Sequence, residues 1–197
     1  MRVYSQLLRS ALMRFAALAG LATLCVVPTT VMAPAAQADT SFGGGCILYP
    51  NDRMATVNAL RTQCSIEQQD KIFFSSSRGD VPMGVTDGWV ARPPIMETLA
   101  PPFWIGKTFY TGPNGGTLLN RITGANIPGF PAYVYSAPER VDHQPAWILD
   151  YAPSVTPQIL DEIREVSPGV WFGYSWWRGA FETALLLSFV LIEHRPA

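Results

Sequence analysis

The chain has few of the residues from which metal sites, nucleotide sites and many hydrolase sites are built. It contains two histidines, His143 and His194, and no Cys-x-x-Cys pair, so it offers no spacing typical of a zinc site. It has no Gly-x-Ser-x-Gly elbow, and Pro113-Asn114-Gly115-Gly116 lacks the Lys-Ser/Thr end of a phosphate-binding loop. No basic run alternates with aromatic residues, which argues against a nucleic-acid partner. We therefore expect no metal, no other cofactor and no nucleic acid.

Long apolar runs are also missing. Residues 15–27 are apolar but fall short of the roughly 20 residues that a membrane-spanning helix needs. Three arginines precede this run, and Ala36-Gln37-Ala38 supplies the small-x-small pattern that a signal peptidase accepts. Residues 1–38 are therefore predicted to be a secretory signal peptide, with an uncleaved anchor as the alternative. After cleavage we expect no stable membrane span and a secreted, periplasmic or cell-envelope location.

Removal of the leader changes the charge of the chain. All 15 acidic residues remain while three arginines leave, so 11 basic residues face 15 acidic ones and the formal charge becomes −4. Residues 39–197 are long enough for one domain with a substantial core. They contain two cysteines, Cys46 and Cys64. In an oxidising compartment a disulfide is the expected fate of such a pair, with a reactive thiol or metal site as the alternative.

Residues 39–78 show helical signals and are expected to form a disulfide-tied helical segment. Asn51 or Asp52 can cap a helix that continues to Cys64, because apolar residues recur there at helical spacing. Ser65 followed by Gln68 forms the sequence of a capping box and predicts a second short helix through Phe74. The next residues include Arg78-Gly79-Asp80, an adhesion tripeptide, but three-residue matches arise often by chance and a plain turn is the simpler interpretation.

Residues 79–197 change from helical to alternating periodicity and are expected to form the main domain. Turn residues separate short strands, and residues 154–160 are predicted to form one helical turn. Few connections are long enough for crossover helices, so the pattern predicts a mainly β fold, an antiparallel barrel of seven or eight strands preceded by short helices. The predicted strands are 84–92, 103–110, 117–123, 130–136, 146–151, 161–166, 170–177 and 184–192.

Charged and large apolar residues alternate on both faces of residues 146–177. Trp147, Leu149 and Tyr151 share one face, and Asp150 lies on the other. A half-exposed sheet would be polar on one face only, so a barrel with a partly polar lumen is one interpretation. Arg164 would then point inward and pair with Asp150 or a neighbouring carboxylate, such as Glu162, because an unpaired buried charge is costly. A solvated ladder of charges on the exterior is the alternative.

Short motifs follow one another in a fixed order across residues 79–192. They are Trp104-Ile105-Gly106-Lys107-Thr108-Phe109, Asn120-Arg121-Ile122, Tyr135, Asp142, Ile148-Leu149-Asp150-Tyr151, and Asp161-Glu162-Ile163-Arg164-Glu165-Val166 with Pro168-Gly169 and Gly173. This series resembles a group of bacterial proteins, common in actinobacteria, with the pattern W-x-G-K-x-F, N-R, D-G, V-L-D-Y-S and R-D-E-I-R-x-V-x-P-G-x-Y-x-G. They in turn resemble lipocalin-like small barrels, including families named after a Gly-x-Trp-x-Gly motif. The chain departs from this pattern at His143, where Gly is usual, and at Ala152, where Ser is usual. The resemblance implies a lipocalin-like barrel and no particular reaction.

Three functions remain open for such a barrel. It could bind a small apolar or amphipathic molecule in its lumen, where eight-stranded barrels often hold ligands. It could be a cofactor-independent cyclase, isomerase or lyase that uses Asp150 or Glu162 as a general acid or base. It could also be purely structural. Binding is favoured, because no nucleophile or metal cluster is evident. The residues expected to contact the ligand are Trp104, Arg121, Tyr135, Asp150, Glu162 and Arg164. The oligomeric state stays open.

Overall fold

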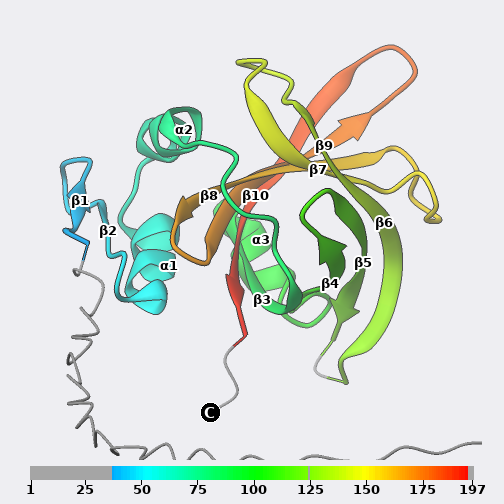
Figure 1. The fold of residues 1–197 in the computed structure, drawn as a ribbon, viewed down its shortest axis with the longest axis horizontal. Helices are drawn as coiled ribbons and strands as arrows, with labels where there is room; N and C mark the ends of the chain where they lie inside the picture. Colours follow the sequence, from blue (N-terminus) through cyan, green and yellow to red (C-terminus); the bar gives the residue numbers. More distant parts are fainter. Residues whose placement is uncertain (1–36, 124, 195–197) are drawn as a thin grey trace, which may run out of the picture. The chain divides into compact units, whose positions relative to one another are not determined.

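Eight antiparallel strands form a closed barrel (Figure 1). The computed structural model describes residues 37–123 and 125–194 of the chain. From β3 to β10 each strand pairs with the next in sequence, and β10 closes the barrel by pairing with β3. The predicted antiparallel barrel is therefore confirmed. The strands are β3 (Gly84–Arg92), β4 (Gly106–Gly112), β5 (Gly115–Ile122), β6 (Ile127–Pro138), β7 (Pro145–Asp150), β8 (Ile159–Ser167), β9 (Val170–Arg178) and β10 (Thr183–Glu193).

Two local predictions fail at places where proline and turn residues cluster. Residues 154–160 form turns instead of a helical turn, and β8 already begins at Ile159. The short helix α3 (Pro94–Leu99) is not predicted by the sequence pattern, although proline is compatible with a first helical turn. Because α3 and the residues after it occupy this connection, β4 begins at Gly106 and not at residue 103.

The predicted N-terminal helical segment is present. A two-stranded sheet of β1 (Thr40–Ser41) and β2 (Ile47–Leu48) precedes α1 (Arg53–Thr62) and α2 (Ile66–Ser75). Asp52 caps α1, and Ser65 and Gln68 form the expected capping box at the start of α2. The Cys46–Cys64 disulfide is confirmed and joins the segment before β2 to the connection between α1 and α2. The predicted signal peptide lies outside the described residues, except for its last two positions.

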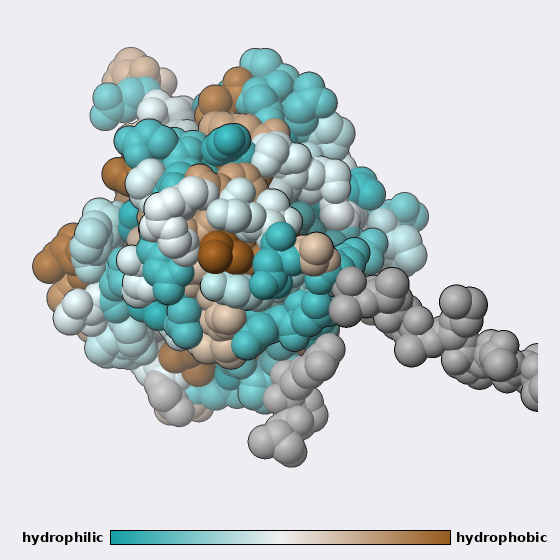
Figure 2. Space-filling model, turned by 90° about the vertical axis from the view of Figure 1, so that its left-hand side faces the viewer, coloured by the Kyte–Doolittle hydropathy of each residue, from teal (hydrophilic) through white to brown (hydrophobic). Residues whose placement is uncertain are grey.

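Part of the barrel wall is buried on both its inner and its outer face, and this explains why both faces of β9 are apolar. Trp171 points into the lumen, where it joins Trp147, Leu149 and Phe189 in an inner core. Its neighbour Phe172 points outward into a second core beneath α1 and α2. The outer surface that these helices present is largely hydrophilic, with separate small apolar spots (Figure 2). The helices therefore cover part of the barrel. Because both faces of β9 are buried, the alternation of its side chains does not separate a solvent-exposed face from a buried one.

Residues 78–81 close one end of the lumen. The indole N–H of Trp147 donates to the carbonyl of Gly79 at 3.2 Å, and that of Trp171 donates to the carbonyl of Asp80 at 2.8 Å. The guanidinium of Arg78 lies 4.3 Å from the ring centre of Trp147. Gly79 has a φ of +68°, and a side chain there would collide with Glu165. The adhesion-like tripeptide is thus a turn, as expected, and it packs across the inner core.

Candidate functional site

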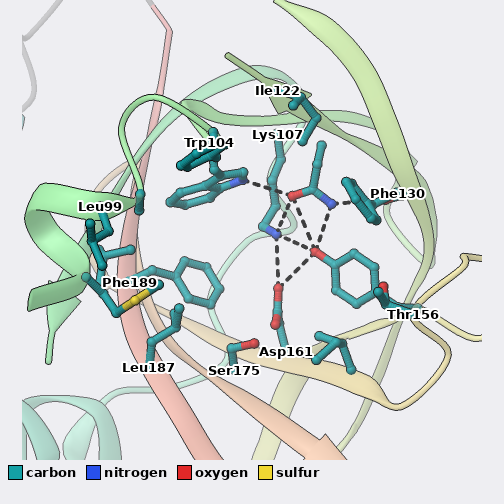
Figure 3. A pocket seen from close by; sticks show the side chains of 17 residues that line it. Leu99, Trp104, Lys107, Ile122, Phe130, Thr156, Asp161, Ser175, Leu187 and Phe189 are labelled. Atoms are coloured by element: carbon teal, nitrogen blue, oxygen red, sulfur yellow. Dashed lines mark hydrogen bonds and ion pairs between the residues drawn. The ribbon is translucent and has the colours of Figure 1, made fainter.

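A cavity of about 600 Å³ occupies the other end of the lumen (Figure 3). Several of its wall residues are partly exposed, including Leu99 of α3, Phe103 and Phe130, and these residues form its mouth. Its walls are mainly apolar, and its polar groups lie close together. The lining comprises Val90, Met96, Leu99, Ala100, Phe103, Trp104, Lys107, Asn120, Ile122, Phe130, Tyr151, Thr156, Ile159, Asp161, Ser175, Leu187 and Phe189.

Five of these residues form one hydrogen-bonded cluster, which we call the lumen cluster: Trp104, Lys107, Asn120, Tyr151 and Asp161. The Lys107 ammonium lies 3.0 Å from Asp161 Oδ2 and 3.0 Å from Asn120 Oδ1, and it also donates to the Tyr151 hydroxyl. Trp104 Nε1 donates to the same Asn120 oxygen at 2.9 Å, and the Tyr151 hydroxyl donates to Asp161 Oδ2 at 3.0 Å. Figure 3 shows these contacts as dashed lines. The cluster therefore holds an ion pair inside the barrel.

Strand register brings the lumen cluster together. Lys107 of β4 pairs directly with Asn120 of β5, and Leu149 of β7 pairs with Asp161 of β8. Tyr151 follows β7 and continues the inward-facing series of Trp147 and Leu149. Side chains two residues apart point to the same face, so Lys107 and Asp161 are in phase with the buried Phe109 and Ile163.

Gly88 makes room for the indole of Trp104, and Gly106 lets β4 approach the backbone of β3 closely. A side chain on Gly88 would meet the far edge of the indole, and one on Gly106 would meet the backbone of Thr86. Gly106 also has a φ of +139°, which disfavours other residues. The ring of Trp104 meets that of Phe189 edge-on, with 5.8 Å between ring centres. Gly88 thus allows an aromatic wall beside the polar cluster.

Burial governs the electrostatics of the cluster. Lys107 and Asp161 are 2% and 3% exposed. Loss of water lowers the pKa of Lys107, and the nearby Asp161 carboxylate opposes this effect. Burial also raises the pKa of Tyr151 well above its ordinary value, and the charge of Asp161 adds to the rise. Tyr151 is therefore a neutral phenol at neutral pH that can both donate and accept hydrogen bonds.

Of the residues predicted to bind a ligand, Trp104 lines this cavity, and the other five do not. Arg121 lies outside the lumen and binds Asp87 at 2.7 Å and the carbonyl of Thr86. Tyr135 donates to Asp150, which pairs with Arg178 at 2.7 Å. Glu162 is buried on the outward face of β8 and accepts a hydrogen bond from Trp176 Nε1 at 2.8 Å.

The predicted inward orientation of Arg164 and its pairing with Asp150 or Glu162 are wrong. Arg164 is fully buried, but on the outward face of β8, where it donates to the carbonyl of Phe73 in α2. Its guanidinium binds both carboxylate oxygens of Asp142 at 2.7 Å. Asp142 lies in the turn between β6 and β7, a segment far from β8 in sequence. The alternative, a solvated ladder of charges on the exterior, is correct only in the direction of the side chain. Arg164 does point outward, but protein and not solvent covers this face.

The sequence pattern does not identify Lys107, Asn120, Tyr151 and Asp161 as ligand-binding residues, although all four lie in the ordered motifs between residues 104 and 166. A usable signal was present in the alternation. Lys107 is two residues from Phe109, and Asp161 is two residues from Ile163, so each charge shares a face with a large apolar residue. A charge on the apolar face of a strand needs a partner on another strand.

No group of three or more metal-ligating side chains lies close enough to hold a metal ion within residues 37–123 and 125–194. Over those same two ranges, none of the helices has both the length and the apolar character needed to cross a membrane. His143 has a φ of +58°, a backbone conformation that favours glycine. Its ring lies in the turn between β6 and β7, and it does not line the cavity.

The burial of Arg164 predicts a large loss of stability when its charge is removed. Arg164→Met should lower the free energy of unfolding by roughly 3–5 kcal/mol, because Asp142 and several carbonyls lose their donors. Arg178→Met is the control, since its side chain is 32% exposed beside Asp150; it should cost about 1 kcal/mol. Denaturant unfolding of both variants at equal m-values tests this comparison, and equal losses would contradict it.

The environment of Glu162 predicts a pH-dependent stability. Burial, followed by the charge of Glu139, raises the pKa of Glu162 from 4.5 to about 7. The folded chain therefore holds this proton more tightly than the unfolded chain, and stability should fall as pH rises from 4.5 to about 7. In Glu162→Gln, the loss of stability over this pH range should be smaller by roughly 1–3 kcal/mol, because the variant lacks the titrating carboxyl group. Melts across this range, with the exposed Glu182→Gln as control, should show a flatter curve for Glu162→Gln alone.

Comparison with known proteins gives information on the fold. No family model matches the chain, and no curated protein matches it. A crystal structure of a protein from Thermomonospora curvata is similar, with a TM-score of 0.50 and 19% sequence identity. The match covers 73% of this chain and 97% of that chain. At this level of identity the similarity supports the barrel fold alone.

Proposed function

We propose that this chain is an exported barrel protein that binds a small apolar or amphipathic ligand in its lumen. One observation carries the proposal: a cavity of about 600 Å³ with apolar walls and one compact polar cluster. Ligand cavities typically have this size and composition, and the mouths of small barrels are common places for them. A purely structural barrel would be expected to fill its lumen with side chains, as the opposite end of this barrel is filled by Trp147 and Trp171.

Catalysis has less support than binding. Glu162 has a pKa near that of a useful general acid, but it faces outward and does not line the cavity. Asp150 pairs with Arg178 and also lies away from the cavity. Within the lumen cluster, the lysine and tyrosine are engaged with neighbouring side chains and have no free nucleophilic role. We therefore keep binding as the function and a carboxylate-dependent enzyme as the alternative.

We also propose that the barrel is related to lipocalin-like proteins. The motifs that suggest this relationship are spread over more than fifty residues of sequence, yet Trp104, Lys107, Asn120, Tyr151 and Asp161 meet in one cluster. Such convergence is expected if the motifs reflect a shared lumen and not chance local similarity.

The proposal predicts that filling the cavity abolishes ligand retention. Native mass spectrometry of protein from its own host should detect a retained small molecule. Leu187→Trp should lose this molecule, because Leu187 lines the cavity. Leu185→Trp, on the same strand but 44% exposed, should keep it. Equal retention by both variants would locate the ligand elsewhere, and a mixture of related molecules in the wild-type protein would favour turnover.

Export is the second part of the proposal. The basic leader, the short apolar run and Ala36-Gln37-Ala38 support cleavage before Asp39, and the Cys46–Cys64 disulfide is compatible with an oxidising compartment. N-terminal sequencing of the protein from the extracellular or envelope fraction should begin at or near Asp39. A full-length chain retained in the membrane would instead support the uncleaved anchor.

A further inference from the structure

We infer that the lumen selects an uncharged ligand, an apolar molecule carrying a hydroxyl group, and rejects acids and amines of similar size. Asp161 is the specificity-determining residue, because it neutralises Lys107 within the cavity. The inference rests on the proposed binding function and names the chemical class of its ligand.

All three hydrogen-bond donors of Lys107 are already in use. An ammonium group has three N–H donors and no acceptor. In the lumen cluster Lys107 uses them on Asn120 Oδ1, the Tyr151 hydroxyl and Asp161 Oδ2. A ligand carboxylate would therefore have to displace one of these partners before it could bind Lys107. Neither Trp104 nor Asn120 offers a replacement, since the indole N–H is bound to Asn120, whose amide N–H groups are bound to Phe130 O and Tyr151.

The residues that line the cavity have no net charge. Of the 17 residues described around the cavity, Lys107 and Asp161 alone carry a formal charge. The two charges of this ion pair cancel. An anionic ligand would leave one negative charge unbalanced in a mostly apolar cavity, and a cationic ligand would leave one positive charge unbalanced. Burying an unbalanced charge is costly, whereas an uncharged ligand adds none.

One polar atom of the lumen cluster, Asp161 Oδ1, is still available to bind a ligand. Asp161 is 3% exposed, and its Oδ1 atom has no hydrogen-bond partner among the described residues. A buried carboxylate oxygen without a donor is unfavourable, so a donor supplied by the ligand would be stabilising. Ser175, whose hydroxyl can donate or accept, lines the same cavity beside it (Figure 3). A hydroxyl group satisfies such a site without adding charge.

The experiment compares three probes with one hydrocarbon tail: decanol, decanoate and decylammonium. Isothermal titration calorimetry at mildly alkaline pH keeps the acid ionised and the amine protonated. Wild-type protein should bind decanol at least about tenfold more tightly than either ion. Tighter binding of decanoate or decylammonium would overturn the inference but leave the proposed binding function standing. If none of the three binds, and no probe of this size enters the lumen, the proposed function itself fails.

The ligand preference of variants with an altered charge balance is an independent test of the inference. Asp161→Asn leaves Lys107 unbalanced and should shift the preference toward decanoate by about tenfold or more. The double variant Lys107→Met/Asp161→Asn removes both charges and should restore the preference for decanol. Circular dichroism and thermal melts check that each variant folds. An unchanged preference in folded Asp161→Asn would overturn the inference, and the wild-type ranking decides it if that variant does not fold.

Discussion

A buried ammonium group must have its charge balanced and its three N–H groups bound, and this requirement shapes the lumen. Lys107 satisfies it with partners from three other places in the barrel: Asn120 on β5, Tyr151 after β7 and Asp161 on β8. The cluster forms only when these strands are in register and the barrel is closed. Its member Tyr151 packs in the inner core with Trp147 and Trp171 and also lines the cavity.

A second constraint is that most of β8 and β9 and the second half of β10 are buried on both faces. Their inward residues build the core of the lumen, while outward residues such as Phe172 and Val190 pack beneath the N-terminal helices. Charged groups on the outer face must therefore be neutralised by protein. Arg164 has all of its N–H groups engaged, by Asp142 and by the carbonyls of Phe73, Gln144 and Pro145. This pair fastens the turn between β6 and β7 to the covered side of the barrel.

The two ends of the barrel differ in a way that suits the proposed function. Residues 78–81 cross one end and receive hydrogen bonds from two tryptophans of the inner core. The other end is bordered by exposed apolar residues, among them Leu99, Phe103 and Phe130. An apolar molecule would enter at this exposed apolar end, because residues 78–81 cross the opposite end. Tyr151 of the lumen cluster packs in the inner core and also lines the cavity. The cavity and the polar groups that would orient the proposed ligand thus lie side by side in the lumen.

By itself the sequence determined the eight strands, α1, α2 and the disulfide, because those signals are local, but it did not predict α3. Alternation located all eight strands to within a few residues, the cap residues located α1 and α2, and the cysteine pair predicted the disulfide. Tertiary structure alone decided which face of each strand is the lumen. Alternation places Asp161 and Glu162 on opposite faces, but both faces are apolar enough to be buried, so the pattern cannot say which charge is inside. The partners lie far apart in sequence, as with Lys107 and Asp161, which are separated by 54 positions. Their pairing depends on barrel closure and on the helices that cover the outer face.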